Sequence, residues 1–237
     1  MYSYFKFNPI NFLFDILAPK LCLICNDLIN NHNIYNEFIC IQCHDKFPAP
    51  PSPPEIYSRL IDNFKKDNIA ISMTYSLFKL QDIEKILDVI HLLKYKGFSR
   101  IGLHFGKELG KILSAYNAIS YDFIAPIPIH SARRRERGYN QSEEIANGVS
   151  EIINIPINNK IVKRKKYTAS QTTLNKNERL TNISKAIITN CDVNDLAGKS
   201  ILLIDDVLTT GSTLNETAIV LLENGAKSVD VATLVAA

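Results

Sequence analysis

The sequence of 237 residues is long enough to bury one substantial core with a smaller module attached to it. Hydrophobic residues make up 46% of the chain and charged residues 22%, which is ordinary for a soluble globular protein. The net charge of +3 is too small to indicate a nucleic-acid-binding protein by itself, so the placement of the positive charge matters more than its sum.

The first 21 residues are apolar but do not predict a membrane span. Pro9, Asp15 and Pro19 interrupt the apolar run, which stays short of the ~20 consecutive residues that a span needs. The segment also lacks the basic leader and small-residue cleavage site of a signal peptide. We expect a short helix over 11–17 that packs onto the protein, and a cytoplasmic location.

Four of the five cysteines form two C-x-x-C pairs near the N-terminus. Cys22 and Cys25 are separated by fourteen residues from Cys40 and Cys43, which is close to the spacing of a structural zinc site with two tight turns. Four thiolates complete a tetrahedral shell, and Zn²⁺ would supply most of the folding energy of so small a module. Two alternatives are four unliganded thiols, or His44 in place of Cys43. The pattern favours a reducing compartment.

A proline cluster over 48–54 predicts an extended linker, because proline at that density cannot continue a helix or a central strand. We therefore expect an N-terminal helix and zinc-binding module over 1–47 and a larger domain over 55–237.

In the larger domain the apolar pattern alternates between strand and helix. Alternation of this kind predicts βαβ units and a mostly parallel sheet, with the ligand beyond the carboxyl ends of the strands. The polar segment 166–182 is long enough for a functional lid. Strands are expected over 69–80, 121–126, 200–204 and 228–235, and helices over 81–95, 100–116, 141–153 and 213–223.

The segment 201–213 combines an apolar strand, two acids and a hydroxyl-rich turn before a helix. Asp205 and Asp206 can accept hydrogen bonds from vicinal hydroxyls or hold a hydrated Mg²⁺. The turn offers backbone N–H groups, hydroxyls and a positive helix end to a phosphate. A purely structural alternative is a capping box formed by Thr213 and Glu216. The turn residues are Thr209, Thr210, Gly211, Ser212 and Thr213.

A second strand leads into a basic turn, where Arg133, Arg134, Arg135 and Arg137 precede Gly138. Arginine suits bidentate phosphate recognition, and a pyrophosphate one strand away from the hydroxyl-rich turn is the natural partner. The alternative is a solvated basic loop. A further basic cluster over 163–166 could contact the same pyrophosphate or the phosphates of a nucleic acid.

The segment 201–213 resembles the phosphoribosyl-pyrophosphate signature of type I phosphoribosyltransferases. The resemblance implies that Asp205 and Asp206 bind the ribose 2- and 3-hydroxyls and that residues 209–213 wrap the 5-phosphate. It also implies phosphoribosyl pyrophosphate or a related ribose phosphate as ligand, with Mg²⁺.

Further motifs resemble the ComF/GntX family of competence proteins. They are R-x-R-E-R-G-Y-N-Q over 133–141, the Lys94-Tyr95-Lys96-Gly97 run, the Arg164-x-x-x-Thr168-x-x-Gln171-x-x-Leu174 pattern and the four-cysteine module. The resemblance spans essentially the whole chain, and Tyr139 departs from it where phenylalanine is more typical.

This resemblance implies an α/β protein with a type I phosphoribosyltransferase fold and a small N-terminal zinc module. It places pyrophosphate at Arg133, Arg135 and Gly138, and a catalytic role at Arg137 beside the two aspartates. Two functions stay open. One is a phosphoribosyltransferase linked to DNA uptake or processing, with an unidentified acceptor. The other is a non-catalytic module that binds a nucleotide or single-stranded DNA and partners a DNA-processing protein.

Overall fold

The computed structural model describes residues 19–64, 68–80, 84–95, 98–116, 120–164, 187–189 and 193–237. The helix expected over 11–17 and the lid expected over 166–182 lie outside these residues. The chain divides into two compact units, Met1–Pro48 and Ala49–Ala237, which are described separately.

The described part of the first unit is built from tight turns around its cysteines. Isolated β-bridges join Leu21 to Leu28 and Ile34 to Cys40, and the short helix α2 (Ile41–His44) follows the second bridge. Ile39 and three of the four cysteines are buried, while larger aliphatic side chains such as Leu28 remain exposed. So small an apolar interior indicates a module that depends on its cysteines.

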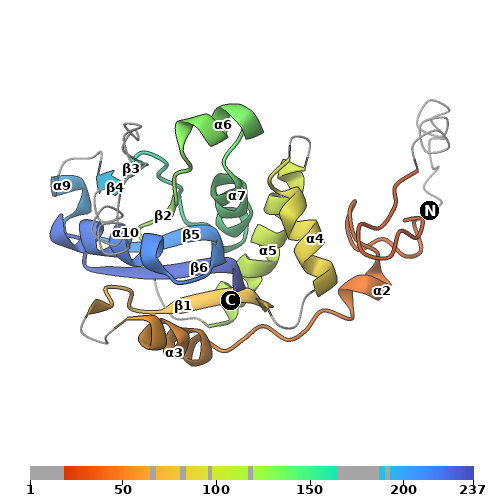
Figure 1. Cartoon of the computed structure of the whole chain (residues 1–237), viewed down its shortest axis with the longest axis horizontal. Coiled ribbons are helices and arrows are strands. Elements are labelled where there is room, and N and C mark those ends of the chain that lie inside the picture. The colour runs from red at the N-terminus through yellow and green to blue at the C-terminus, as the bar shows by residue number, and fades with distance from the viewer. Residues whose placement is uncertain are drawn as a thin grey trace, which may run out of the picture. The chain divides into compact units, whose positions relative to one another are not determined.

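The second unit contains a four-stranded sheet in which every pairing is parallel (Figure 1). Its strand order is β1 (Thr74–Lys79), β6 (Ser228–Ala236), β5 (Ser200–Leu208) and β2 (Phe123–Pro126). The parallel sheet expected from the alternating pattern is therefore confirmed. A separate antiparallel pair is formed by β3 (Val162–Arg164) and β4 (Ile187–Thr189).

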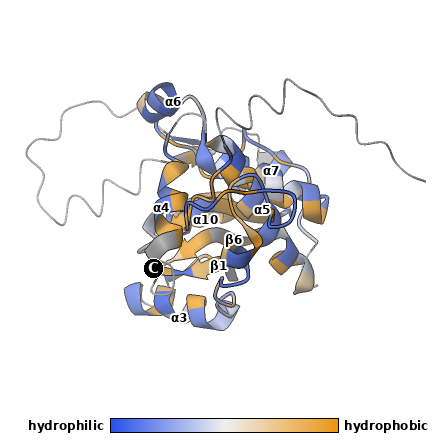
Figure 2. Ribbon diagram, turned by 90° about the vertical axis from the view of Figure 1, so that its right-hand side faces the viewer, coloured by the Kyte–Doolittle hydropathy of each residue, from blue (hydrophilic) through white to orange (hydrophobic). Residues whose placement is uncertain are grey.

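Helices cover both faces of the parallel sheet. One face packs on α3 (Pro53–Asn63) and α10 (Ser212–Glu223), whose buried side chains join the same core cluster as alternate residues of β5 and β6. The other face packs on α5 (Ser99–Ala115) and α7 (Gln141–Ile153). In Figure 2 the strand β6 is coloured hydrophobic and the short helix α6 (Ser131–Arg137) hydrophilic. The remaining helices are α4 (Glu84–Leu92) and α9 (Val193–Leu196).

Helices α5 and α7 approach each other at backbone distance because glycines line their contact. A Cβ atom added at Gly106 would overlap the carbonyl oxygen of Ile145, and one added at Gly148 would overlap that of Leu103. This close approach lets the two helices pack side by side over one face of the sheet. Among the described residues, no helix combines the length and the apolar character that crossing a membrane requires.

Several expected boundaries need correction. Pro53 and Pro54 open helix α3 instead of ending the linker, because proline is tolerated in the first turn, where its missing N–H is not needed. Strand β5 runs to Leu208, so both aspartates lie within it. Helix α10 begins at Ser212 with Gly211 as its N-cap, and this rules out a capping box at Thr213.

Candidate functional site

The 209–213 loop connects the carboxyl end of β5 to the first turn of α10 and lines a small pocket of about 160 Å³. Gly211 has φ +78°, and a Cβ there would overlap Leu60 of α3, so only glycine fits without strain. The side chains of Thr210 and Ser212 lie 3.0 Å apart, oxygen to oxygen. Among the residues that the structure describes, no lysine or arginine lines this pocket, so hydroxyls and a helix N-terminus are its anion-binding groups, with Asp205 at its edge.

Asp205, near the end of β5 and before this loop, is held by hydrogen bonds from two sides. The Ser142 hydroxyl donates to Asp205 Oδ1 at 2.9 Å, and the backbone N–H of Asp206 donates to the same oxygen at 2.9 Å. Burial, together with the neighbouring Asp206 carboxylate, raises the pKa of Asp205 to about 7. A divalent cation would relieve this repulsion between adjacent carboxylates, so the pair fits a Mg²⁺ site.

Asn140 explains why Ser142 reaches the aspartate. Its side chain caps α7 by accepting from the Ser142 N–H at 3.3 Å, and it donates to the carbonyl of Ile127, just after β2, at 2.9 Å. The cap therefore fixes the start of α7 to the strand edge. Sequence reasoning did not assign Ser142 to the site, although an asparagine before a predicted helix is a recognisable N-cap signal.

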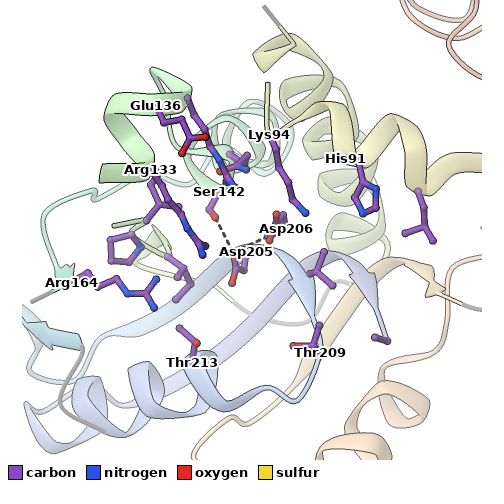
Figure 3. A pocket seen from close by; sticks show the side chains of 18 of the residues that line it. His91, Lys94, Arg133, Glu136, Ser142, Arg164, Asp205, Asp206, Thr209 and Thr213 are labelled. Carbon is purple, nitrogen blue, oxygen red and sulfur yellow. Dashed lines mark hydrogen bonds between the residues drawn. The ribbon is translucent and has the colours of Figure 1, made fainter. Parts of the chain in front are cut away.

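A larger cleft of about 650 Å³ opens beside the small pocket and shares Asp205, Val207, Thr209 and Thr213 with it (Figure 3). Acidic and basic groups face each other across this cleft. Its polar and charged lining consists of His91, Lys94, Arg133, Glu136, Arg137, Gln141, Ser142, Arg164, Asp205, Asp206, Thr209 and Thr213.

Helix α6 sorts the arginines by its periodicity. Arg133 and Arg137, one turn apart, line the cleft. Arg134 instead forms a bidentate ion pair with Glu143, with N–O distances of 2.6 and 3.0 Å, and hydrogen bonding to that carboxylate raises its pKa. Arg135 is exposed and is not part of the cleft wall.

Gly138 has a structural place in this arrangement and does not line the cleft. It is the C-cap of α6 with φ +83°, a conformation that suits glycine. The structure thus brings two of the four arginines together with the aspartates. His91, in the last turn of α4, and Lys94, just after that helix, also line the cleft and were not predicted as site residues.

The four cysteines of the first unit form a second candidate site. All four Sγ atoms lie within 4.8 Å of one another, and those of Cys25 and Cys40 are 3.8 Å apart. A tetrahedron with Zn–S bonds of about 2.3 Å has an edge of about 3.8 Å, so the cluster can hold a metal such as zinc. The ring of His44 stacks on Tyr35, with 3.6 Å between centroids, and does not belong to the cluster.

Backbone N–H groups prepare one of these thiols for a metal. Burial opposes ionisation of Cys22, but hydrogen bonds from the backbone of Cys40, Cys25 and Ile24 lower its pKa to about 7. The thiolate is the form that binds a metal, and a thiol with a lowered pKa reaches that form more readily.

Comparison with known proteins agrees with this geometry. Residues 127–237 match the phosphoribosyl transferase domain family. Competence protein F of Haemophilus influenzae is 37% identical over 108 residues, which cover 46% of this chain and 47% of that protein. Competence protein ComFC of Bacillus subtilis is 25% identical over 237 residues, covering 91% of this chain and 94% of its own. The DNA utilization protein YhgH of Escherichia coli is 32% identical over 147 residues, which cover 60% of this chain and 63% of that protein.

This chain is similar to phosphoribosyltransferase-like proteins of the ComF family. It has a type I phosphoribosyltransferase fold, with a parallel sheet flanked by helices and four clustered cysteines near its N-terminus. The match to the Haemophilus protein spans about half of that protein's length.

The phosphoribosyl transferase match contains most of the cleft but not all of it. It begins at Ile127, just after β2, and includes α6, α7 and the 209–213 loop. The wall built by His91 and Lys94 lies before the matched residues. The chain therefore completes its cleft with residues from outside the matched domain.

Proposed function

We propose that this ComF-family protein binds phosphoribosyl pyrophosphate with Mg²⁺ at the carboxyl edge of its sheet. The observation that supports the proposal is the pair of adjoining pockets that meet at Asp205. A ligand with two phosphate-bearing ends on one ribose fits two anion-binding pockets separated by a pair of carboxylates.

Each part of the site has one task in this proposal. Residues 209–213 hold the 5-phosphate through backbone N–H groups and hydroxyls. Asp205 and Asp206 accept hydrogen bonds from the ribose hydroxyls and hold Mg²⁺, which would neutralise charge on the pyrophosphate. Arg133 and Arg137 bind the pyrophosphate on the α6 side of the cleft. Arg137 would stabilise the negative charge that develops if pyrophosphate departs.

Calorimetry on the zinc-loaded protein tests this proposal. Phosphoribosyl pyrophosphate with Mg²⁺ should bind the wild type, and binding should be lost in the Asp205→Asn, Asp206→Asn double variant. Asp195→Asn is a matched control, because Asp195 is exposed on α9 and lies outside both pockets. A folded wild type that does not bind the ligand contradicts the proposal. Once binding is found, a screen of nucleobases and other nucleophiles for pyrophosphate release tests catalysis.

A second proposal concerns DNA. The relatives carry the names competence protein and DNA utilization protein, and Arg135 on α6 is exposed outside the cleft. We infer that the α6 surface around the exposed Arg135 contacts single-stranded DNA or a DNA-processing protein. Affinity for a single-stranded oligonucleotide should fall steeply with salt and should decrease in Arg135→Gln. No binding at low salt would exclude the DNA contact.

A further inference from the structure

Part of the cleft wall belongs neither to the 209–213 loop nor to helix α6. Lys94 follows α4 and, in Figure 3, points into the cleft near Asp206, on the side away from Arg133. It is exposed, and it forms no ion pair with any residue that the structure describes. Its ammonium group is therefore available to an anion in the cleft.

Tyr139 holds the turn that carries Lys94. Its hydroxyl donates a hydrogen bond to the carbonyl of Leu93 and lies 3.3 Å from the carbonyl of Tyr95, so it contacts the residues on both sides of Lys94. Burial of its ring raises the pKa of Tyr139 to about 12, which keeps the hydroxyl a donor.

The position of Tyr139 in the chain links the two walls of the cleft. It directly follows Gly138, the C-cap of α6, and so lies two residues after Arg137. One short turn thus follows Arg137 directly and, through the Tyr139 hydroxyl, holds the two residues that flank Lys94. A phenylalanine at this position would fill similar space but would donate no hydrogen bond.

We propose that Tyr139 is a positioning residue that places Lys94 as a further cation for the pyrophosphate end of the ligand, in the cleft that Arg133, Arg137 and Arg164 also line. Lys94 lines the larger cleft and does not line the small pocket of the 209–213 loop, so it serves pyrophosphate and not the 5-phosphate. This inference rests on the proposed binding of phosphoribosyl pyrophosphate.

The test uses Lys94→Met, Tyr139→Phe and the double variant in the full chain, with Lys160→Met as the control for loss of one exposed lysine outside the cleft. Calorimetry measures two probes separately, Mg²⁺-pyrophosphate and ribose 5-phosphate. Lys94→Met should weaken pyrophosphate binding about tenfold, which is the usual effect of losing one charge-assisted hydrogen bond. Tyr139→Phe should weaken it by a smaller factor, and ribose 5-phosphate affinity should stay within about twofold of wild type in both.

The double variant separates positioning from a structural role. If Tyr139 acts through Lys94, the double variant binds pyrophosphate no more weakly than Lys94→Met alone. The inference is overturned if Tyr139→Phe lowers pyrophosphate affinity by the same factor in the Lys94→Met background as in the wild type. It is also overturned if Tyr139→Phe lowers the affinity for ribose 5-phosphate as much as that for pyrophosphate. A wild type that binds neither probe contradicts the proposed function as well. A wild type that binds both, with Lys94→Met unchanged, contradicts this inference alone.

Discussion

Replacing Asp205 with asparagine should stabilise the folded protein at neutral and alkaline pH while removing ligand binding. Burial and the adjacent Asp206 carboxylate raise the pKa of Asp205 from 3.8 to about 7. At about 1.4 kcal/mol per pH unit, this corresponds to a penalty of up to about 4 kcal/mol for carrying the charge. An asparagine side chain at this position keeps an oxygen that can accept from the Ser142 hydroxyl and the Asp206 N–H. We therefore expect a gain of about 2 kcal/mol at pH 8, since the buried amide has its own desolvation cost.

The pH dependence gives the sign of this effect. Between about pH 4 and pH 7 the folded wild type binds more protons at Asp205 than the unfolded chain does. Wild-type stability from this group therefore falls as pH rises through that window, and the full penalty is present above about pH 7. Asp205→Asn has no such group, so its advantage over wild type should grow from near zero at pH 5 to its maximum at pH 8.

Urea unfolding followed by circular dichroism measures this difference. Midpoints at pH 5, 6, 7 and 8 are compared at equal m values, in Mg²⁺-free buffer without chelator, because a chelator would remove zinc from the cysteine cluster. Added Mg²⁺ should raise the urea midpoint of the wild type at pH 8 and leave the midpoint of Asp205→Asn unchanged. Asp195→Asn, an exposed control, should stay within about 0.5 kcal/mol of wild type at each pH. An advantage of Asp205→Asn that is equal at pH 5 and pH 8 would refute the reasoning.

Three further substitutions probe the scaffold, the loop and the cysteine cluster. Gly148→Ala should destabilise the protein by at least about 2 kcal/mol in urea unfolding, because the new Cβ overlaps backbone at Leu103. Gly102→Ala, its control, should be near neutral, because the nearest atoms to its Cβ belong to two side chains at 3.0 Å or more, and it gains about 1 kcal/mol of helix propensity. Gly211→Ala should weaken ribose 5-phosphate binding about tenfold in calorimetry, because φ +78° costs a residue with a Cβ about 1–2 kcal/mol. Cys22→Ser should make the Met1–Pro48 unit protease-sensitive while Ala49–Ala237 keeps its circular dichroism. If the Met1–Pro48 unit resists the protease equally well in the wild type and in Cys22→Ser, the module does not depend on a metal.

The parallel sheet and its strand-to-helix turns were predictable because each depends on local pattern. The apolar run before Asp205 and the hydroxyl-rich turn after it stand next to each other in the sequence, and so do the two C-x-x-C pairs. Helix α7 was predicted with its observed bounds because its apolar residues repeat at helical spacing.

Helices α3 and α6 were missed for two different physical reasons. Helix α6 has seven residues, none of them buried, so no apolar stripe marks it. The sequence of α3 begins with two prolines, which were counted with the linker although proline suits the first turn of a helix. Consequently we predicted that the four arginines form one basic turn. In the helix, Arg133 and Arg137 instead line the cleft, and Arg134 pairs with Glu143.

The remaining site residues could not be found locally, because they reach the cleft through long-range contacts. Ser142 meets Asp205 across 63 positions of sequence, and Tyr139 meets Leu93 across 46. Neither contact leaves a trace in hydropathy or spacing. Only the packing of α7 against the sheet and of the α4 end against the α6–α7 turn brings these groups together.

Charge divides the site into two parts that recognise anions differently. The 209–213 loop uses dipoles and hydroxyls beside an ionisable carboxylate, and no lysine or arginine lines its pocket among the described residues. The cleft beyond Asp205 instead has cations from separate elements, with Arg133 and Arg137 from α6, Arg164 from β3 and Lys94 from just after α4. The end of the ligand with more negative charge gains most from the cationic walls, and a single phosphate is satisfied by the neutral loop. In the proposed binding mode, this asymmetry would give phosphoribosyl pyrophosphate one preferred direction in the site, with its ribose over the two aspartates.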